Sequence, residues 1–172
     1  MNTNEKVAAK INLIKLPVNN EYEFEFDQST DWVRDILLEL NEEATDKKPE
    51  DYLKETSLII DGSVVKKNNA EWGEYFIVRG HIQATYATEC IRTLQPMTVD
   101  LDIPLKICFF DQSLATSELF EDQDETYVDQ EVMEIYFYDK RTIDFQEMIH
   151  EQVFLHYEHY PALDADSPIP AN

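Results

Sequence analysis

The stretch Tyr75–Phe110, YFIVRGHIQATYATECIRTLQPMTVDLDIPLKICFF, decides the fold because its side chains alternate in character at a period of two. Since successive strand side chains point to opposite faces, the pattern predicts two long strands that each turn one face to a core. The first core face comprises Phe76, Val78, Gly80, Ile82, Ala84, Tyr86, Thr88 and Cys90, and the second comprises Met97, Val99, Leu101, Ile103, Leu105, Ile107 and Phe109.

About five residues separate the two strands, which predicts an antiparallel hairpin with a turn centred on Cys90–Pro96. Pro104 lies inside the second strand and has no amide donor. We therefore expect the second strand to form an edge of the sheet, or to bulge at Pro104.

Further strands and two helices are predicted outside the hairpin. Helical spacing of apolar residues predicts amphipathic helices at Asp31–Glu42 and Asp144–Leu155. Shorter strands are expected at residues 11–17, 22–26, 57–67 and 132–138, and a turn at 66–69. Residues 41–55 are expected to form a polar loop or linker, either without regular structure or with a short helix at Glu50–Leu53. The predicted fold class is α+β, with a curved antiparallel sheet, barrel or sandwich-like, and two principal helices. Residues 1–10 are predicted to be a disordered lead, 11–161 a single domain and 162–172 a flexible tail.

The net charge of −22 at pH 7 constrains the partners. Proteins that bind nucleic acid usually present a basic surface, because phosphate contacts supply much of the affinity. Direct RNA binding is therefore disfavoured and a basic protein partner is favoured, although the acidity also fits a role in solubility alone. No apolar run approaches the roughly 20 residues of a membrane span, and no signal-peptide core is evident, so a cytoplasmic location is expected.

An acidic segment covers residues 111–131, within a longer stretch, 107–139, that has no lysine or arginine. Apolar residues are interleaved with the acids. This composition fits two interpretations, a docking loop for a basic partner and a flexible surface loop. The candidate docking residues are Glu118, Phe120, Glu121, Asp122, Asp124 and Glu125.

Signatures of catalysis are scarce. The three glycines are scattered singly, so no phosphate-binding loop is predicted, and no nucleophile elbow is present. Asp100 and Asp102 share one strand face, which fits acid–base chemistry by paired carboxylates and equally fits a strand face turned to solvent. Cys90 is expected to be a buried thiol and Cys108 a thiol on the surface side. We predict no enzyme activity, no cofactor and no metal site.

Two stretches resemble the YceD/DUF177 family. The first is Gly80-His81-Ile82-Gln83-Ala84 followed by Cys90-Ile91-Arg92-Thr93-Leu94-Gln95-Pro96. The second is Thr142-Ile143-Asp144-Phe145, then Glu147, Glu151-Gln152-Val153-Phe154-Leu155 and Pro161. The chain departs from the family pattern at Thr93, where many members have a second cysteine, and in its tail, which lacks their cysteine-rich end.

The resemblance implies a function in accumulation of 23S ribosomal RNA and assembly of the large ribosomal subunit, without enzyme activity. It also implies a binding role for the turn residues Cys90, Arg92, Leu94 and Pro96. Combined with the acidity, this predicts an accessory factor that docks a basic protein, such as a ribosomal protein or an assembly factor. The alternative hypothesis is a β-barrel that binds a small molecule or lipid, because a curved sheet rich in Tyr and Phe can enclose a ligand.

Overall fold

The computed structural model describes residues 9–12, 15–158 and 161–162. Most of the predicted disordered lead and nearly all of the predicted tail lie outside these residues. The strands are β1 (Lys10–Asn12), β2 (Glu21–Asp27), β3 (Ser57–Asn69), β4 (Gly73–Glu89), β5 (Pro96–Asp111), β6 (Glu125–Val128), β7 (Glu131–Tyr138) and β8 (Thr142–Asp144). The α-helices are α1 (Asp31–Leu40) and α2 (Phe145–Leu155), and the short 3-10 turns are η2 (Asn41–Glu43), η3 (Pro49–Tyr52) and η4 (Gln112–Leu114).

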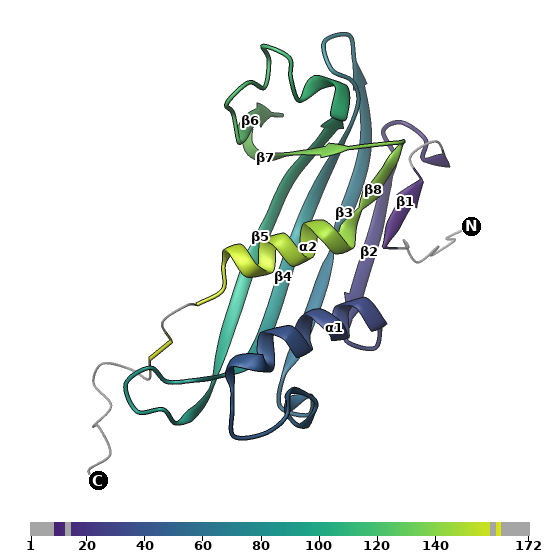
Figure 1. Cartoon of the computed structure of the whole chain (residues 1–172). Helices are drawn as coiled ribbons and strands as arrows, with labels where there is room; N and C mark the ends of the chain where they lie inside the picture. Colours follow the sequence, from purple (N-terminus) through teal and green to yellow (C-terminus); the bar gives the residue numbers. More distant parts are fainter. Residues whose placement is uncertain (1–8, 13–14, 159–160, 163–172) are drawn as a thin grey trace. The chain divides into compact units, whose positions relative to one another are not determined.

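Six strands form one sheet in the order β2-β3-β4-β5-β7-β6, and β1 pairs with β8 in a second, two-stranded sheet (Figure 1). The large sheet is mostly antiparallel and stays open in the described part of the chain. The predicted α+β class with a curved sheet and two helices is therefore confirmed, whereas closure into a barrel is not observed. One pair departs from the antiparallel prediction, because β5 runs parallel to β7.

The predicted hairpin is formed by β4 and β5. The predicted core face of β4 is buried except at Gly80, which is half-buried. Pairing between β5 and β7 begins only at Ile107, opposite Glu134. Pro104 thus lies in the part of β5 that precedes this pairing, where a missing amide donor breaks no hydrogen bond to β7.

The described residues group into two compact units, and five elements contribute residues to both: β2, β3, β4, β5 and α2. Unit 1 comprises the described residues up to 25, 61–81 and 104–148, and unit 2 comprises 26–60, 82–103 and the described residues from 149 onward.

Unit 1 has an apolar cluster on the face of β4 that was predicted to be the outer one. Its buried members are Tyr75, Ile77, Cys108, Phe110, Phe120, Val128 and Met133, with Trp72, Leu114, Ile135 and Phe137 packed against them. The prediction of a surface-side thiol at Cys108 is wrong, because the acidic segment folds over this face and buries the residue. Burial raises the pKa of the Cys108 thiol.

Two glycines hold β3 and β4 of unit 1 unusually close. A Cβ added to Gly80 would lie 2.1 Å from the carbonyl oxygen of Asp61, and one added to Gly62 would lie 2.3 Å from that of Arg79. Only glycine fits such a close approach of two backbones. The close approach of β3 therefore explains why the Gly80-x-Ile82-x-Ala84 stretch begins with glycine.

The turn predicted at residues 66–69 is wrong, because β3 continues to Asn69. Lys66 is buried and forms an ion pair of 3.3 Å with Glu74, so its charge is paired within the protein rather than solvated at a turn.

Unit 2 is built around the apolar stripe of α1, whose buried residues are Val33, Ile36, Leu37 and Leu40. His150 of α2 lies 2.9 Å from the carboxylate of Glu39, which joins the two helices. The first turn of α2 belongs to unit 1, where Asp144 accepts a hydrogen bond from the backbone amide of Glu147, as expected of a residue that caps a helix N-terminus.

The predicted polar loop at 41–55 is ordered and packs within unit 2. Asn41 is fully buried, donates to Thr56 and accepts from the backbone amide of Ala87 on β4. Tyr52 is also buried, and it packs with Ala44 and Ala87. A buried amide with both ends satisfied fixes the position of the segment that follows α1.

Neither helix reaches the length and apolarity of a membrane span, and this holds for all helices among the described residues.

Candidate functional site

The turn between β4 and β5, residues 90–95, is closed by its own backbone. The amide of Leu94 donates to the carbonyl of Cys90 at 2.8 Å, and the amide of Cys90 donates to the carbonyl of Gln95 at 2.9 Å. The Thr93 hydroxyl accepts from the amide of Gln95 at 3.3 Å. Cys90 is fully buried under the turn, while Arg92, Gln95 and Pro96 are exposed.

Leu94 has an unusual conformation for an apolar residue. Its φ is 56°, in the left-handed region, and its side chain is 72% exposed. This conformation costs an L-residue other than glycine roughly 1–2 kcal/mol, and burial does not offset the cost here. The other non-glycine residues recorded with positive φ are all polar: Asn19, Asp122, Asp129, Gln130, Lys140 and Arg141.

Residues after α2 contact the turn and the end of β4 that leads into it. The carbonyl of Pro161 accepts a hydrogen bond of 2.9 Å from the amide of Ile91. Tyr86 of β4 stacks on Tyr157, with ring centroids 5.3 Å apart, and the Tyr86 hydroxyl accepts from the amide of Glu158. The structure thus joins the two sequence stretches that carry the family resemblance, which lie far apart along the chain.

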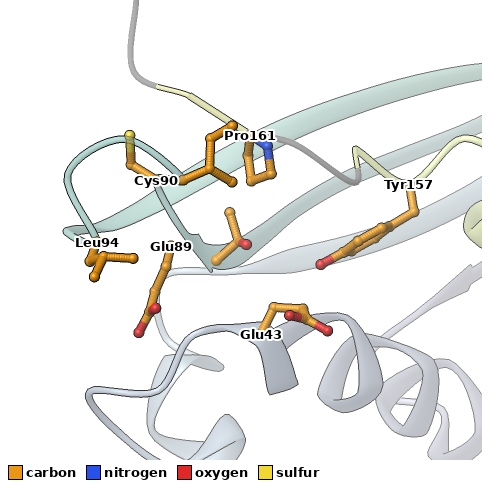
Figure 2. Close-up of a pocket in the computed structure, with 8 residues that line it drawn as sticks. Glu43, Glu89, Cys90, Leu94, Tyr157 and Pro161 are labelled. Carbon is orange, nitrogen blue, oxygen red and sulfur yellow. The ribbon is translucent and has the colours of Figure 1, made fainter.

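A cavity of about 230 Å³ opens beside the turn (Figure 2). In the close-up, the phenol oxygen of Tyr157 points into it, and Glu43 enters from the helical turn that follows α1. Cys90 and Leu94 lie at the cavity, whereas Arg92 and Pro96 are not among its lining residues. The lining residues are Glu43, Thr88, Glu89, Cys90, Ile91, Leu94, Tyr157 and Pro161.

Of the lining residues, only Cys90 and Leu94 were predicted as site residues, and Glu43, Thr88, Glu89 and Tyr157 lie outside both resembling stretches. Glu43 belongs to the segment read as a polar loop, and Tyr157 lies just beyond the last helix. No local pattern marks either residue, because their role comes from packing against a distant turn. The two remaining lining residues, Ile91 and Pro161, did give a signal in the sequence, because each belongs to a resembling stretch.

The cavity combines negative charge with a neutral phenol. The Glu89 carboxylate accepts hydrogen bonds from the backbone amide of Thr45, at 3.1 Å, and from the Thr45 hydroxyl. Burial raises the pKa of Tyr157; a hydrogen bond with Thr88 opposes this shift, and the charge of Glu43 adds to it. Burial likewise raises the pKa of Tyr86 to about 12. The Glu43 carboxylate lies near the Tyr157 hydroxyl (Figure 2), and Glu89 is a second carboxylate among the lining residues. Two carboxylates in one cavity attract a cation.

The acidic segment lies in unit 1, where its candidate residues divide into two groups. Phe120 is buried, and its ring lies 4.4 Å from that of Phe110. The acids are all exposed: Glu118, Glu121, Asp122, Asp124 and Glu125. The segment is folded rather than extended, with η4, a series of turns and strand β6, which pairs with β7.

The weaker candidates are not brought into a shared site. Asp100 accepts a hydrogen bond of 2.6 Å from the Thr85 hydroxyl and is exposed, as is Asp102. Among the residues that the structure describes, no cluster of three or more His, Cys, Asp or Glu side chains is placed to hold a metal ion.

A scan against family models matches residues 78–169, more than half of the chain, to the YceD family, described as large ribosomal RNA subunit accumulation protein YceD. This range contains the turn, the acidic segment and the chain up to and beyond Pro161. Searches of curated proteins and of solved structures each returned no significant match.

Proposed function

Because this chain belongs to the YceD family, we propose that it is a non-enzymatic accessory factor in the accumulation of 23S ribosomal RNA and assembly of the large ribosomal subunit, acting in the cytoplasm. One observation supports this proposal above the others. The family match covers both resembling stretches, and in the fold these are hydrogen-bonded to each other through Ile91 and Pro161.

The chemistry of the cavity supports a binding role over catalysis. Cys90 is fully buried, so its thiol is not presented to a substrate as a nucleophile. The Glu89 carboxylate is engaged by Thr45, and Tyr157 has a raised pKa that keeps it protonated. General acid–base work needs groups with pKa values near the operating pH and within reach of the substrate.

Charge favours a basic protein as the partner. With a net charge of −22, the chain repels phosphate and attracts lysine- and arginine-rich surfaces. The exposed acids of the segment 111–131 speed the encounter with such a surface, while the turn at 90–96 supplies the close contact.

The ligand-binding barrel is not favoured. The sheet stays open within the described residues, and its core is filled by large side chains that are fully buried, including Tyr86, Phe76, Phe110 and Phe145. The two recorded cavities are lined in part by carboxylates, which a lipid-binding site would avoid.

Affinity capture of the tagged protein from its own cells, with and without RNase, tests the proposal. We expect large-subunit ribosomal proteins or assembly factors, identified by mass spectrometry, to remain bound after RNase treatment. Their loss on RNase treatment would mean that RNA mediates the contact, and capture of no ribosomal material in either arm would contradict the proposed function itself.

A salt titration with bare 23S ribosomal RNA provides a second test. Weak binding is expected at physiological salt. Sub-micromolar binding that falls steeply with salt would show that phosphate contacts dominate, against the expectation from charge.

A further inference from the structure

Leu94 is a strained apolar residue whose side chain is largely exposed, so burial of the side chain does not offset the cost of the strain. Its φ of 56° and its 72% exposure occur together on the turn, and Ile91, three residues earlier, is 52% exposed. A turn selected only for stability would place Gly or Asn at such a position. Strained residues persist where the local conformation serves a function.

The turn that displays these side chains is held firmly. Backbone hydrogen bonds link Leu94 to Cys90 and Ile91 to Pro161, and Cys90 is fully buried beneath them. The apolar pair is therefore presented on a fixed support, which reduces the entropy lost when a partner binds.

Negative charge lies directly beside the apolar pair. Ile91 and Leu94 line the same 230 Å³ cavity as Glu43 and Glu89 (Figure 2). One oxygen of the Glu89 carboxylate accepts hydrogen bonds from Thr45, whereas the side chain of Glu43 is exposed on η2. The phenol of Tyr157 adds a neutral hydroxyl that points into the cavity.

We infer that this cavity and the turn beside it form a docking site for a short protein segment in which lysine or arginine alternates with an apolar residue. The cationic side chain enters between Glu43, Glu89 and the Tyr157 hydroxyl, and the apolar side chain packs on Leu94 and Ile91. Charge complementarity identifies the occupant, because two carboxylates and no cationic residue line the cavity. This inference rests on the proposed function, since it gives the chemistry of the basic partner.

The test uses the full chain and a defined probe, a fluorescently labelled peptide Gly-Lys-Leu-Lys-Leu-Lys-Gly, with binding measured by anisotropy at physiological salt. We expect a Kd in the range of about 10–300 µM, as is reasonable for a short peptide with one or two anchoring side chains. Peptides with glutamine for lysine, or serine for leucine, should each bind at least about fivefold more weakly, because each lacks one of the two contacts.

Matched variants locate the contact on the chain. L94N removes the apolar side chain but keeps a residue that tolerates the left-handed conformation, and E43Q removes one carboxylate charge. The controls are L119N, at another exposed leucine, and E42Q, which changes the neighbouring residue of η2 that lines a different cavity. L94N and E43Q should each weaken the peptide at least about fivefold, and the controls by less than about twofold.

Equal binding by all four variants, equal binding of the serine peptide, or no binding up to millimolar peptide would overturn the inference. Self-association of the wild type that L94N abolishes would overturn it too, because the surface would then belong to a second copy of the chain. Capture of ribosomal proteins in an RNase-resistant form by L94N would leave the proposed function intact and place docking elsewhere. The reverse result, peptide binding as expected with no ribosomal capture, would reject the proposed function alone.

Discussion

The turn at 90–96 and the acidic segment at 111–131 were both predicted to bind a partner. They differ in the burial of their apolar residues, which are packed into a core in the acidic segment and exposed in the turn. In the acidic segment, Phe120 and Val128 are buried in the core of unit 1, and the charges remain outside. In the turn, Cys90 is buried but Ile91 and Leu94 are exposed. Apolar residues in an acidic loop can therefore stabilise the fold of the loop itself, whereas the apolar residues of the turn stay exposed, which is the basis of the docking site that we propose.

The largest expected effect tests the first half of this comparison. Phe120→Ala should lower the free energy of unfolding by roughly 3–5 kcal/mol, because it empties a space packed against Phe110, Trp72 and Phe137. Urea denaturation provides the measurement. The control Leu119→Ala, at a residue that is 40% exposed, should cost less than about 1 kcal/mol. If the two variants lose the same stability, Phe120 does not anchor the segment.

Alkaline pH should lower the free energy of unfolding, because it ionises the buried Tyr86 next to the segment that contacts the turn. Folding raises the pKa of Tyr86 from its ordinary value of 10.0 to about 12, because burial disfavours the phenolate. The stabilising contribution is therefore complete below pH 10 and is lost as the pH rises through about 12. Urea denaturation at pH 9 and at pH 11.5 should show this loss, and it should be smaller in Tyr86→Phe. Tyr52 and Tyr138, whose pKa values burial also raises to about 12, contribute equally to both proteins. An identical loss in both proteins would contradict a role for Tyr86.

The turn should respond to substitution with the opposite sign from the acidic segment. Leu94→Gly relieves the left-handed backbone, and we expect stability to stay within about 0.5 kcal/mol of the wild type or to rise by up to about 1 kcal/mol. Leu94→Val, β-branched in the same conformation, should lose about 1 kcal/mol or more. Thermal unfolding distinguishes the two. A clear loss of stability in Leu94→Gly would show that the leucine side chain stabilises the fold.

The smallest expected effect is on peptide affinity, and it distinguishes long-range electrostatic attraction by the acidic segment from direct contact with the peptide. Neutralising the five exposed acids, E118Q/E121Q/D122N/D124N/E125Q, removes five charges from a net charge of −22. Affinity for the lysine–leucine peptide should fall by only about two- to threefold at low salt, and the difference should vanish near 0.5 M salt, where screening removes long-range attraction. Anisotropy titrations at both salt concentrations measure this. A tenfold loss that persists in high salt would make the acidic segment itself the docking surface.

Period-two alternation was sufficient to predict the β4–β5 hairpin, because a strand with one buried face must repeat every second residue. Helical spacing placed α1 and α2 within two residues of their observed ends. The second core of unit 1 was not predicted. Tyr75, Ile77 and Cys108 lie on a face interrupted by polar residues such as Arg79, and only the folded acidic segment shows that this face is covered.

The structure places some, but not all, of the predicted turn residues at the cavity. The turn residues Cys90 and Leu94 lie at the cavity, as does Pro161 from the second resembling stretch. Glu43 and Tyr157 were missed, because each comes to the turn only through packing of segments distant in sequence. The short strands β6 and β8 were missed as well, since a strand of three or four residues carries too few positions to show a period.

By itself the sequence determined the fold class, the long hairpin, the two helices and the resemblance to the YceD family, because these depend on local periodicity and on short motifs. The tertiary structure alone decided that the acidic segment folds over an apolar face, that Pro161 binds the backbone of the turn, and that two carboxylates and a phenol lie beside an exposed leucine. The physical reason is that a sequence pattern records which side of its own element a residue lies on. It does not record which distant segment covers that side.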